Sequence, residues 1–343
     1  MKRLGFIARA DNTGLGVKTW EYFKNLHPDK TMVIDISHLK EMKAYPERYE
    51  AGNDQKVMFV HEQPSKKEVD EFLNNIDVLF SCETFYNPYL LNKAKQLGIR
   101  TVLQPNFEFL NLAESPDFYI APSEWNFQKA RKLLMSEGWS ERKTISRYKF
   151  LPVPINRELL PFELKKKAKT FLHIAGKPAL KDRNGTNILL EAIPLVKSNV
   201  KFLIRSQEPI KGIRDKRVTV ITKNIDNYWE LYDNADVMVM PRKFGGLCLP
   251  LNEAMSKGLV PIMPDISPQN KFLHKDCLVE AELKEVIPTK QQIELYEITP
   301  QDLAKKIDWM ANQDITHLSH YSNRYADKLD WERMRVIYNE ELR

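Results

Sequence analysis

The stretch NADVMVMPRKFGGLCLPLNEAMSKGLVPIMPD runs from Asn234 to Asp265. The apolar runs near its two ends each predict a buried strand. Between them lie Gly245 and Gly246, followed by helical periodicity from about Pro250. A helix that starts directly after a glycine-rich loop presents its free backbone amides to an anion. The stretch therefore predicts a strand–loop–helix–strand unit with a place for a phosphate group.

The same alternation of short apolar runs and amphipathic stretches extends through most of the 343 residues. It predicts parallel strands covered on both faces by crossover helices, which is a doubly wound α/β fold. A proline-rich and then lysine-rich stretch, from Pro152 to about Lys169, interrupts the pattern once. We therefore expect two Rossmann-like domains. The predicted segments are 1–155 for the first domain, 156–169 for a linker, 170–325 for the second domain and 326–343 for a C-terminal helix.

The charge balance leaves the partner open. The 52 basic and 46 acidic residues give a net charge of +6, with basic residues concentrated at Lys165–Lys169 and Lys211–Arg217. Such runs form either a solvated surface or a contact for an anionic partner. No apolar run approaches the ~18 residues that a membrane span needs.

Cysteine usage favours a reducing, cytoplasmic environment. Cys82, Cys248 and Cys277 are scattered without the CxxC spacing of a metal site and without the pattern of a disulfide framework. His38 and His61 each follow a predicted strand, but no second ligand pairs with them, so we expect no metal site. The N-terminal apolar run is short and is followed by polar residues, which predicts a first strand rather than a secretion signal.

A second glycine pair follows the first predicted strand. Gly14 and Gly16 permit a tight turn, and a helix is expected from about Val17. The free amides at such a junction favour an anion, so Gly14 and Gly16 are candidate donor-binding residues. The third glycine and the later acidic residue of a dinucleotide fingerprint are not clearly present, which disfavours a nicotinamide oxidoreductase. A tight turn without a ligand explains the two glycines equally well.

The stretch from Asn234 to Asp265 resembles the donor-binding core of retaining GT-B glycosyltransferases of the GT4 type. Their pattern is a strand ending in P-S, then E-G-F-G-L-P-x-x-E-A-M-A-x-G-x-P-V-I-x-x-D. The positions that match in register are Pro241, Gly246, Leu249, Pro250, Glu253, Ala254, Met255, Gly258, Pro261, Ile262 and Asp265. The resemblance implies two domains facing a central cleft, with a C-terminal helix around Trp331 that crosses back to the first domain. It also implies retaining transfer of a sugar from a UDP- or GDP-type nucleotide sugar, with no metal and no cofactor.

The resemblance assigns the donor site to this loop and helix. Glu253 takes the position of the glutamate that binds the donor ribose. The loop contributes Gly245, Gly246, Leu247, Cys248 and Leu249. The family's other glutamate, which contacts the sugar, falls at Gly245, so that carboxylate is absent. The donor sugar is then gripped differently, or the branch is divergent, or catalysis has been lost.

The family's phosphate-binding basic pair has partial counterparts after the first strand of the second domain. Lys177 takes the arginine position, and the lysine position is Asn184, with Lys181 and Arg183 close by. Lys177 and Arg183 are therefore candidate catalytic residues that neutralise the leaving phosphate, and Lys181 is a candidate donor-binding residue. A metal-free transferase needs such charge compensation.

In the first domain, Asn106 aligns with a histidine that relatives carry after the corresponding strand. Asn106 and Glu108 are candidate catalytic residues, although an asparagine cannot act as a base. Other loops expected at the same edge carry Glu83 and, after a later strand, Ser123 and Glu124.

The acceptor is left open by the sequence. A glycan, a small molecule and hydroxymethylated DNA all remain candidates, and a DNA acceptor requires a basic stripe and salt-sensitive binding. The alternative from another class is a non-catalytic nucleotide-sugar-binding protein of the same fold, suggested by Gly245 and Asn106. The oligomeric state is not predicted.

Overall fold

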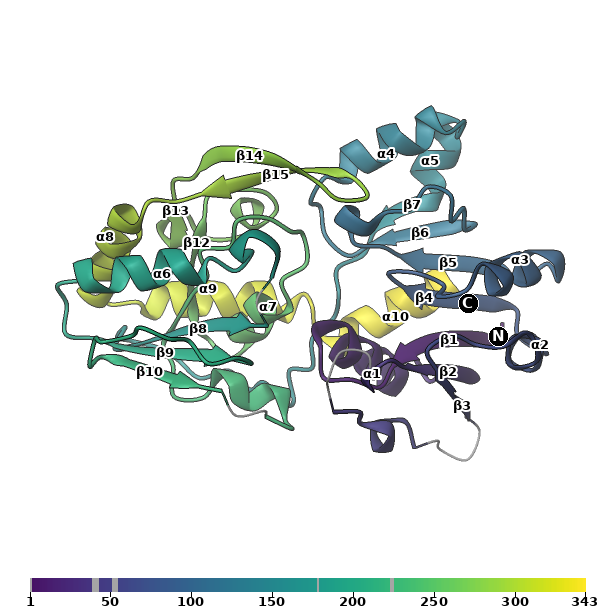
Figure 1. Ribbon diagram of the computed structural model, residues 1–343, viewed down its shortest axis with the longest axis horizontal. Coiled ribbons are helices and arrows are strands. Elements are labelled where there is room, and N and C mark those ends of the chain that lie inside the picture. The colour runs from purple at the N-terminus through teal and green to yellow at the C-terminus, as the bar shows by residue number, and fades with distance from the viewer. Residues whose placement is uncertain (1, 39–42, 51–54, 178, 223–224) are drawn as a thin grey trace. The chain divides into compact units, whose positions relative to one another are not determined.

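A computed structural model describes the whole chain except residues 1, 39–42, 51–54, 178 and 223–224. The chain divides into two compact units. Unit 1 comprises Met1–Pro154 and Trp331–Arg343, and unit 2 comprises Ile155–Asp330. Each unit is built around a parallel sheet flanked by helices (Figure 1).

Unit 1 contains a seven-stranded parallel sheet in the order β3-β2-β1-β4-β5-β6-β7. The reversal of strand order between β1 and β4 is the switch point of a doubly wound sheet, where ligands bind beyond the carboxyl ends of the strands. The strands are β1 (Leu4–Arg9), β2 (Lys30–Asp35), β3 (Lys56–His61), β4 (Val78–Cys82), β5 (Arg100–Gln104), β6 (Phe118–Ala121) and β7 (Tyr148–Phe150). The helices are α1 (Gly14–Leu26), η2 (Pro46–Tyr49), α2 (Lys66–Leu73), α3 (Pro88–Gln96), η3 (Phe107–Phe109), α4 (Phe127–Ser136), α5 (Glu141–Arg147) and α10 (Trp331–Leu342).

Unit 2 repeats this arrangement with a six-stranded parallel sheet in the order β10-β9-β8-β11-β12-β13, and its switch point lies between β8 and β11. An antiparallel hairpin of β14 and β15 follows. The strands are β8 (Thr170–Gly176), β9 (Lys201–Ser206), β10 (Val218–Ile221), β11 (Val237–Val239), β12 (Val260–Pro264), β13 (Leu278–Val279), β14 (Glu282–Pro288) and β15 (Gln292–Glu297). The helices are η4 (Leu180–Asp182), α6 (Thr186–Ala192), η5 (Ile193–Leu195), η6 (Tyr228–Tyr232), α7 (Leu249–Ser256), η7 (Gln269–Lys271), η8 (Lys275–Cys277), α8 (Pro300–Ala311) and α9 (Thr316–Asp327).

The central strands are mostly apolar because helices cover both of their faces. Every residue of β1, β4 and β12 is buried, whereas the edge strand β3 is largely accessible. The fold prediction of two Rossmann-like α/β domains is therefore confirmed. None of the helices in the described part of the chain is both long and apolar enough to cross a membrane.

Helix α10 completes the core of unit 1. Its Tyr338 hydroxyl hydrogen-bonds the hydroxyl of Tyr22 from α1 at 2.9 Å and accepts a hydrogen bond from the Gln104 amide at 3.0 Å. Trp331 packs edge-on against the Tyr22 ring, with the ring centroids 5.4 Å apart. Burial raises the pKa of both tyrosine hydroxyls, which therefore act as neutral hydrogen-bonding groups. Figure 1 shows α10 lying beside α1, to which it is joined within unit 1 although the two helices lie at opposite ends of the sequence.

The stretch expected as a linker, 156–169, is grouped with unit 2. Leu160 is fully buried, and its carbonyl accepts a hydrogen bond from the Ser256 hydroxyl of α7 at 2.8 Å. The backbone amide of Glu163 donates to the carbonyl of Lys257 at 3.2 Å. The backbone of this stretch is so close to Gly258 that a Cβ there would lie 2.3 Å from the Glu163 carbonyl oxygen.

Candidate active site

The expected donor residues lie on two loops at the switch point of unit 2. One loop joins β8 to α6 and the other joins β11 to α7, and β8 and β11 are neighbours in the sheet. The backbone amide of Lys243 donates to the carbonyl of Arg183 at 2.9 Å, which ties the loops together. A Cβ on Gly185 would lie only 2.0 Å from the Pro241 carbonyl oxygen, so this crossing requires glycine.

Two arginines converge on Gly245, where the GT4 pattern has its first glutamate. A Cβ on Gly245 would lie 2.3 Å from Nη2 of Arg183 and 2.7 Å from Nη2 of Arg242. Those two nitrogens can therefore be no further apart than about 5 Å, a separation at which like charges repel appreciably near a protein surface. Gly245 itself has φ of 107°, a backbone conformation that favours glycine.

Arg242 is the more constrained of the two arginines. It is buried, its Nε donates to the Phe244 carbonyl at 3.0 Å, and its Nη2 donates to the Leu247 carbonyl at 2.9 Å. The Arg183 guanidinium lies over the Phe244 ring, 5.3 Å from its centroid. A pair of guanidinium groups held in this way favours an anion between them.

Lys243 does not add to this positive charge, because its partners neutralise it. Its ammonium lies 2.7 Å from Glu297 and 3.9 Å from Asp182. Asp182 also accepts hydrogen bonds of 3.0 Å from the first amides of α6, on Thr186 and Asn187. Burial raises the pKa of Asp182. The amides at the start of α6 are thus capped by the chain itself.

Glu253 lies on α7 and faces η6. Helix α7 begins at Leu249, one residue before the expected start near Pro250, so Glu253 follows its first turn. Its side chain is 7% exposed, and Oε2 accepts a short hydrogen bond from the hydroxyl of Tyr232. Burial and the negative charge of Glu253 raise the pKa of Tyr232 well above its ordinary value, so the hydroxyl remains a donor. The carboxylate is held in one orientation.

The structure separates the candidate basic residues. Lys177 and Arg183 both line a cavity of about 520 Å³ beside α6. Lys181 instead pairs with Glu285 of β14, with 3.1 Å between the ammonium nitrogen and Oε1. Asn184, at the position of the family's lysine, donates to the carbonyl of Ala175 at 3.0 Å.

In unit 1, the two candidate glycines belong to the start of α1. The helix begins at Gly14, three residues before the expected start, because the Thr13 side chain caps it by accepting from the Gly16 amide at 3.3 Å. A Cβ on Gly16 would lie 1.9 Å from the Asp11 carbonyl oxygen. Close packing against residue 11 therefore accounts for Gly16, while Gly14 is exposed at the helix end.

Asn106 and Glu83 come together at the carboxyl ends of β5 and β4. The Asn106 amide nitrogen donates to Glu83 Oε1 at 2.8 Å. The amide oxygen of Asn106 is buried and has no hydrogen-bond partner within the described part of the chain. Glu108 is 3% exposed, so its carboxylate is poorly accessible to a substrate. Glu124 is exposed, and Ser123 caps the following turn through a 3.3 Å hydrogen bond from the Trp125 amide.

Three polar groups near this edge were not candidates from the sequence. Arg9, the last residue of β1, forms a buried ion pair with Asp11, which follows the strand. Burial lowers the pKa of Arg9, but Tyr86 and Asp11 raise it, and the net shift is upward. Burial raises the pKa of Tyr86. Charged residues at the end of an otherwise apolar first strand were the available signal. Among the described residues, no group of three or more histidine, cysteine, aspartate or glutamate side chains is arranged to hold a metal ion.

Residues 168–310 match the sequence model of the group 1 glycosyl transferases. Solved structures share the fold of the whole chain at low identity. HepE from Anabaena in complex with UDP and glucose superposes with a TM-score of 0.69 at 11% identity, covering 100% of this chain and 99% of that one. The sucrose-phosphate synthase of Thermosynechococcus elongatus gives 0.66 at 12% identity, with 99% and 98% covered. The lipopolysaccharide outer core galactosyltransferase WaaB gives 0.62 at 12% identity, with 98% of both chains covered. No curated protein matches the sequence significantly.

The chain is a glycosyltransferase with the GT-B fold. The matched segment of this glycosyltransferase includes both switch-point loops of unit 2, with the arginine pair and Glu253. The prediction of a GT4-like glycosyltransferase, made from the stretch between Asn234 and Asp265, is confirmed.

Proposed function

We propose that this glycosyltransferase moves a hexose-type sugar from a UDP- or GDP-type nucleotide sugar to a hydroxyl acceptor, with retention at the anomeric carbon. The observation that carries the proposal is the convergence of Arg183 and Arg242 on Gly245. Gly245 lies in the loop that leads into α7, the helix that carries Glu253. The pair of guanidinium groups suits a diphosphate, since each can donate parallel hydrogen bonds to phosphate oxygens. HepE, which has the same fold, was solved with UDP and glucose.

In the proposed reaction, the bond between the anomeric carbon and the leaving phosphate oxygen breaks while the acceptor oxygen bonds to the same carbon. The leaving phosphate oxygen takes the acceptor's proton, so no protein base and no metal is required. Lys177 and Arg183 neutralise the charge that develops on the leaving diphosphate. Lys181 is paired with Glu285 and contributes only to the electrostatic potential around the donor.

The donor nucleotide is assigned to the loop that begins at Gly245 and to the helix α7 that follows it. Glu253, oriented by Tyr232, accepts hydrogen bonds from the ribose hydroxyls. The diphosphate meets the loop Gly246–Leu249 and the start of α7. Since Gly245 supplies no carboxylate to the sugar, the sugar's hydroxyl groups must be recognised elsewhere.

Unit 1 is assigned to the acceptor. The unpartnered amide oxygen of Asn106 can accept a hydrogen bond from a hydroxyl group, while Glu83 fixes the amide from the other side. Gly14 and Gly16 bring the start of α1 to the same edge of the sheet, and Glu108 is buried behind it. A glycan, a small molecule or hydroxymethylated DNA would fit this assignment. A cytoplasmic location is proposed from cysteine usage alone.

A thermal-shift screen with UDP, GDP and their sugars tests the donor assignment. We expect one nucleotide series to raise the melting temperature of the wild type and to lose this effect in Glu253→Gln, which keeps the shape of the side chain. Glu285→Gln serves as the control, since it removes a carboxylate from the hairpin of the same unit. If no uridine or guanosine compound stabilises the wild type, the donor proposal fails.

Turnover and acceptor choice need separate experiments. Hydrolysis or transfer of a labelled donor is expected; donor binding without turnover on any acceptor would instead favour a binding protein. Binding of the protein to duplex DNA at low salt, lost at moderate salt, would support a DNA acceptor because phosphate contacts release counterions. No binding to DNA at any salt concentration would remove that candidate.

A further inference from the structure

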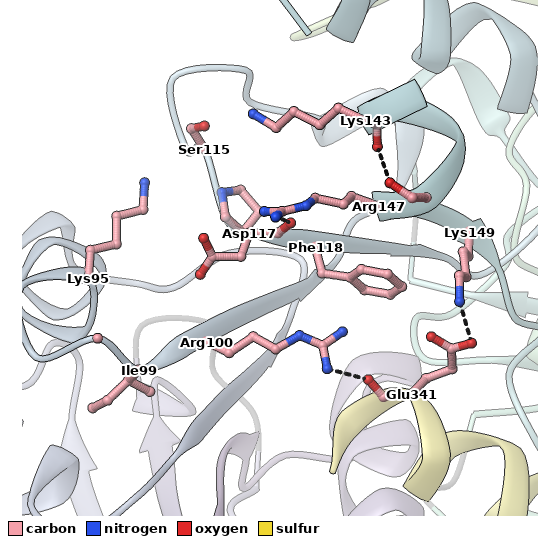
Figure 2. Close-up of a pocket in the computed structure, with 13 residues that line it drawn as sticks. Lys95, Ile99, Arg100, Ser115, Asp117, Phe118, Lys143, Arg147, Lys149 and Glu341 are labelled. Atoms are coloured by element: carbon pink, nitrogen blue, oxygen red, sulfur yellow. Dashed lines mark hydrogen bonds and ion pairs between the residues drawn. The ribbon is translucent and has the colours of Figure 1, made fainter. Parts of the chain in front are cut away.

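A cavity of about 840 Å³ lies at the opposite edge of the unit 1 sheet from Asn106 and Glu83. It is formed where β5 and β6 begin, with α3 on one side and α5 and β7 on the other (Figure 2). Arg100 opens β5 and Asn106 follows the end of that strand. The five residues of β5 rise about 3.3 Å each, so the length of this strand, about 16 Å, separates the cavity from the candidate acceptor site.

The lining of this cavity is strongly basic. It contains five cationic side chains, Lys95, Arg100, Lys143, Arg147 and Lys149, against two carboxylates, Asp117 and Glu341. These cations come from two separate stretches, 95–100 and 143–149, so no single run of lysines explains them. Figure 2 shows Lys95, Lys143 and Arg147 extending toward the same space above Asp117 and Phe118.

The two carboxylates do not balance these charges. Asp117 Oδ2 accepts hydrogen bonds from the amide and the hydroxyl of Thr101, both at 2.9 Å, and is thereby held in the sheet. Glu341 pairs with Lys149, with 2.6 Å between Nζ and Oε1. Its carbonyl oxygen, not its carboxylate, accepts from Arg100 at 2.9 Å.

The contacts described for the other cations are also uncharged. Arg147 donates to the carbonyl of Asp117 at 3.5 Å, and the Lys143 ammonium lies over the Trp139 ring, 4.0 Å from its centroid. Burial lowers the pKa of Arg100, and the charge of Arg147 lowers it further, against the raising effect of Glu341 and Asp117. An anion in the cavity would relieve this repulsion.

We propose that this cavity is a second ligand site that binds a small molecule carrying two or more phosphate-type groups. Its volume lies within the range of small-molecule sites, and Ile99 and Phe118 give it an apolar wall. Nucleic acid is disfavoured, because it requires a basic stripe along a surface rather than a concave cluster. The phosphate groups belong either to a soluble ligand or to a lipid headgroup.

Calorimetric titration with sodium tripolyphosphate at low ionic strength tests the proposal. We expect the double variant Lys143→Gln/Arg147→Gln to weaken binding by about tenfold or more, because each removed charge takes away a charge-assisted hydrogen bond. The matched control is Lys132→Gln/Arg142→Gln, which removes two exposed charges from the same helix pair but none from the cavity. It should bind as the wild type does.

The arginine pair in unit 2 is itself able to bind this probe, so the titration is repeated with Arg183→Gln. Binding that survives in Arg183→Gln and disappears in Lys143→Gln/Arg147→Gln belongs to the cavity. Equal binding by the cavity variant and the wild type, or no binding by the wild type, overturns the proposal. Thermal unfolding of each variant shows that loss of binding is not loss of folding.

Vesicles of phosphatidylcholine with and without cardiolipin, a lipid with two phosphate groups, distinguish the two sources of phosphate. Cosedimentation that requires cardiolipin, is displaced by tripolyphosphate and is lost in the cavity variant would identify a lipid headgroup. Binding of tripolyphosphate without cosedimentation would identify a soluble ligand. Cosedimentation that the cavity variant retains would contradict a lipid site in this cavity.

Discussion

The hydroxyl of Tyr232 donates a hydrogen bond to Oε2 of Glu253, and both side chains are buried in unit 2. Tyr232 ends the short helix η6, whereas Glu253 belongs to α7, so the bond joins these two elements. A hydrogen bond from a buried hydroxyl fixes the direction in which the Glu253 carboxylate can meet a ligand. Tyr232 is therefore a positioning residue for Glu253.

Tyr232→Phe should raise KM for the donor by about tenfold with a smaller effect on kcat. The reason is that the ribose contact of Glu253 stabilises the bound donor and the transition state equally. It should also lower the free energy of unfolding by about 1–2 kcal/mol, since a buried carboxylate loses its donor. Steady-state kinetics and denaturant unfolding measure the two effects. Tyr296→Phe, which removes the hydroxyl of an exposed tyrosine–glutamate pair in β15, is the matched control. An unchanged KM in Tyr232→Phe would show that Glu253 is not positioned in this way.

Gly245→Glu restores the carboxylate of the GT4 pattern but should reduce transfer rather than improve it. The positive φ of Gly245 costs a side chain about 1–2 kcal/mol, and the new Cβ would displace the end of Arg183. A carboxylate here would also pair with the two arginines and compete with the diphosphate. Gly245→Ala imposes the same backbone cost without the charge. Initial rates that fall further in Gly245→Glu than in Gly245→Ala are expected, and a gain of activity in Gly245→Glu would refute the arginine-pair site.

Arg183→Gln and Lys181→Gln should have unequal effects although the two residues are neighbours in sequence. Arg183 reaches Gly245, while Lys181 pairs with Glu285 at the hairpin. Loss of one group that stabilises transition-state charge typically costs about 10²–10³ in kcat. We expect a loss of that order for Arg183→Gln and less than about tenfold for Lys181→Gln in single-turnover assays. Similar losses in the two variants would contradict the assignment.

His173 of β8 makes unit 2 less stable in acid. The ring is fully buried; Nδ1 donates to the Val239 carbonyl at 2.8 Å, and Nε2 accepts from the Thr186 hydroxyl at 2.8 Å. Burial lowers the pKa of His173 from 6.5 to about 4. Between these values the unfolded chain binds more protons than the folded one, so stability falls as pH drops from about 6.5 toward 4, by up to ~3 kcal/mol.

Unfolding midpoints at pH 7 and pH 5 measure this effect. His173→Asn should lower stability at pH 7 and show a smaller loss between the two pH values than the wild type does. His317→Gln, at an exposed position on α9, should keep the wild-type pH dependence. A His173→Asn variant with the full wild-type dependence would assign the acid sensitivity to other groups.

The central strands could be predicted from the sequence because burial on both faces makes them continuously apolar. β14 and β15 could not, since their exposed charged residues obscure the alternation of a hairpin. Helix starts were displaced by local chemistry: the Thr13 cap brings the start of α1 forward to Gly14. Boundaries of this kind depend on side-chain hydrogen bonds that periodicity does not report.

The candidate site was predictable only where one contiguous pattern contained it. Gly245 and Glu253 lie eight positions apart in a single motif, so sequence alone identified them. Tyr232, the partner of Glu253, comes from another segment and was found only by three-dimensional contact. Arg183 was a candidate from the sequence, but its approach to Gly245 was not predictable. The basic cavity at Arg100 and Lys143 likewise has no counterpart in any run of the sequence.

Unit 2 is inserted into unit 1, since the chain leaves unit 1 at Pro154 and returns to it at Trp331. During synthesis, the partners of Tyr22 and Gln104 on α10 are therefore made only after the whole of unit 2 has been synthesised. Unit 2 is contiguous and can fold first, while the earlier-made strands of unit 1 wait with an exposed apolar face. A chaperone that shields this face would act on a nascent chain of this glycosyltransferase until Tyr338 has been added.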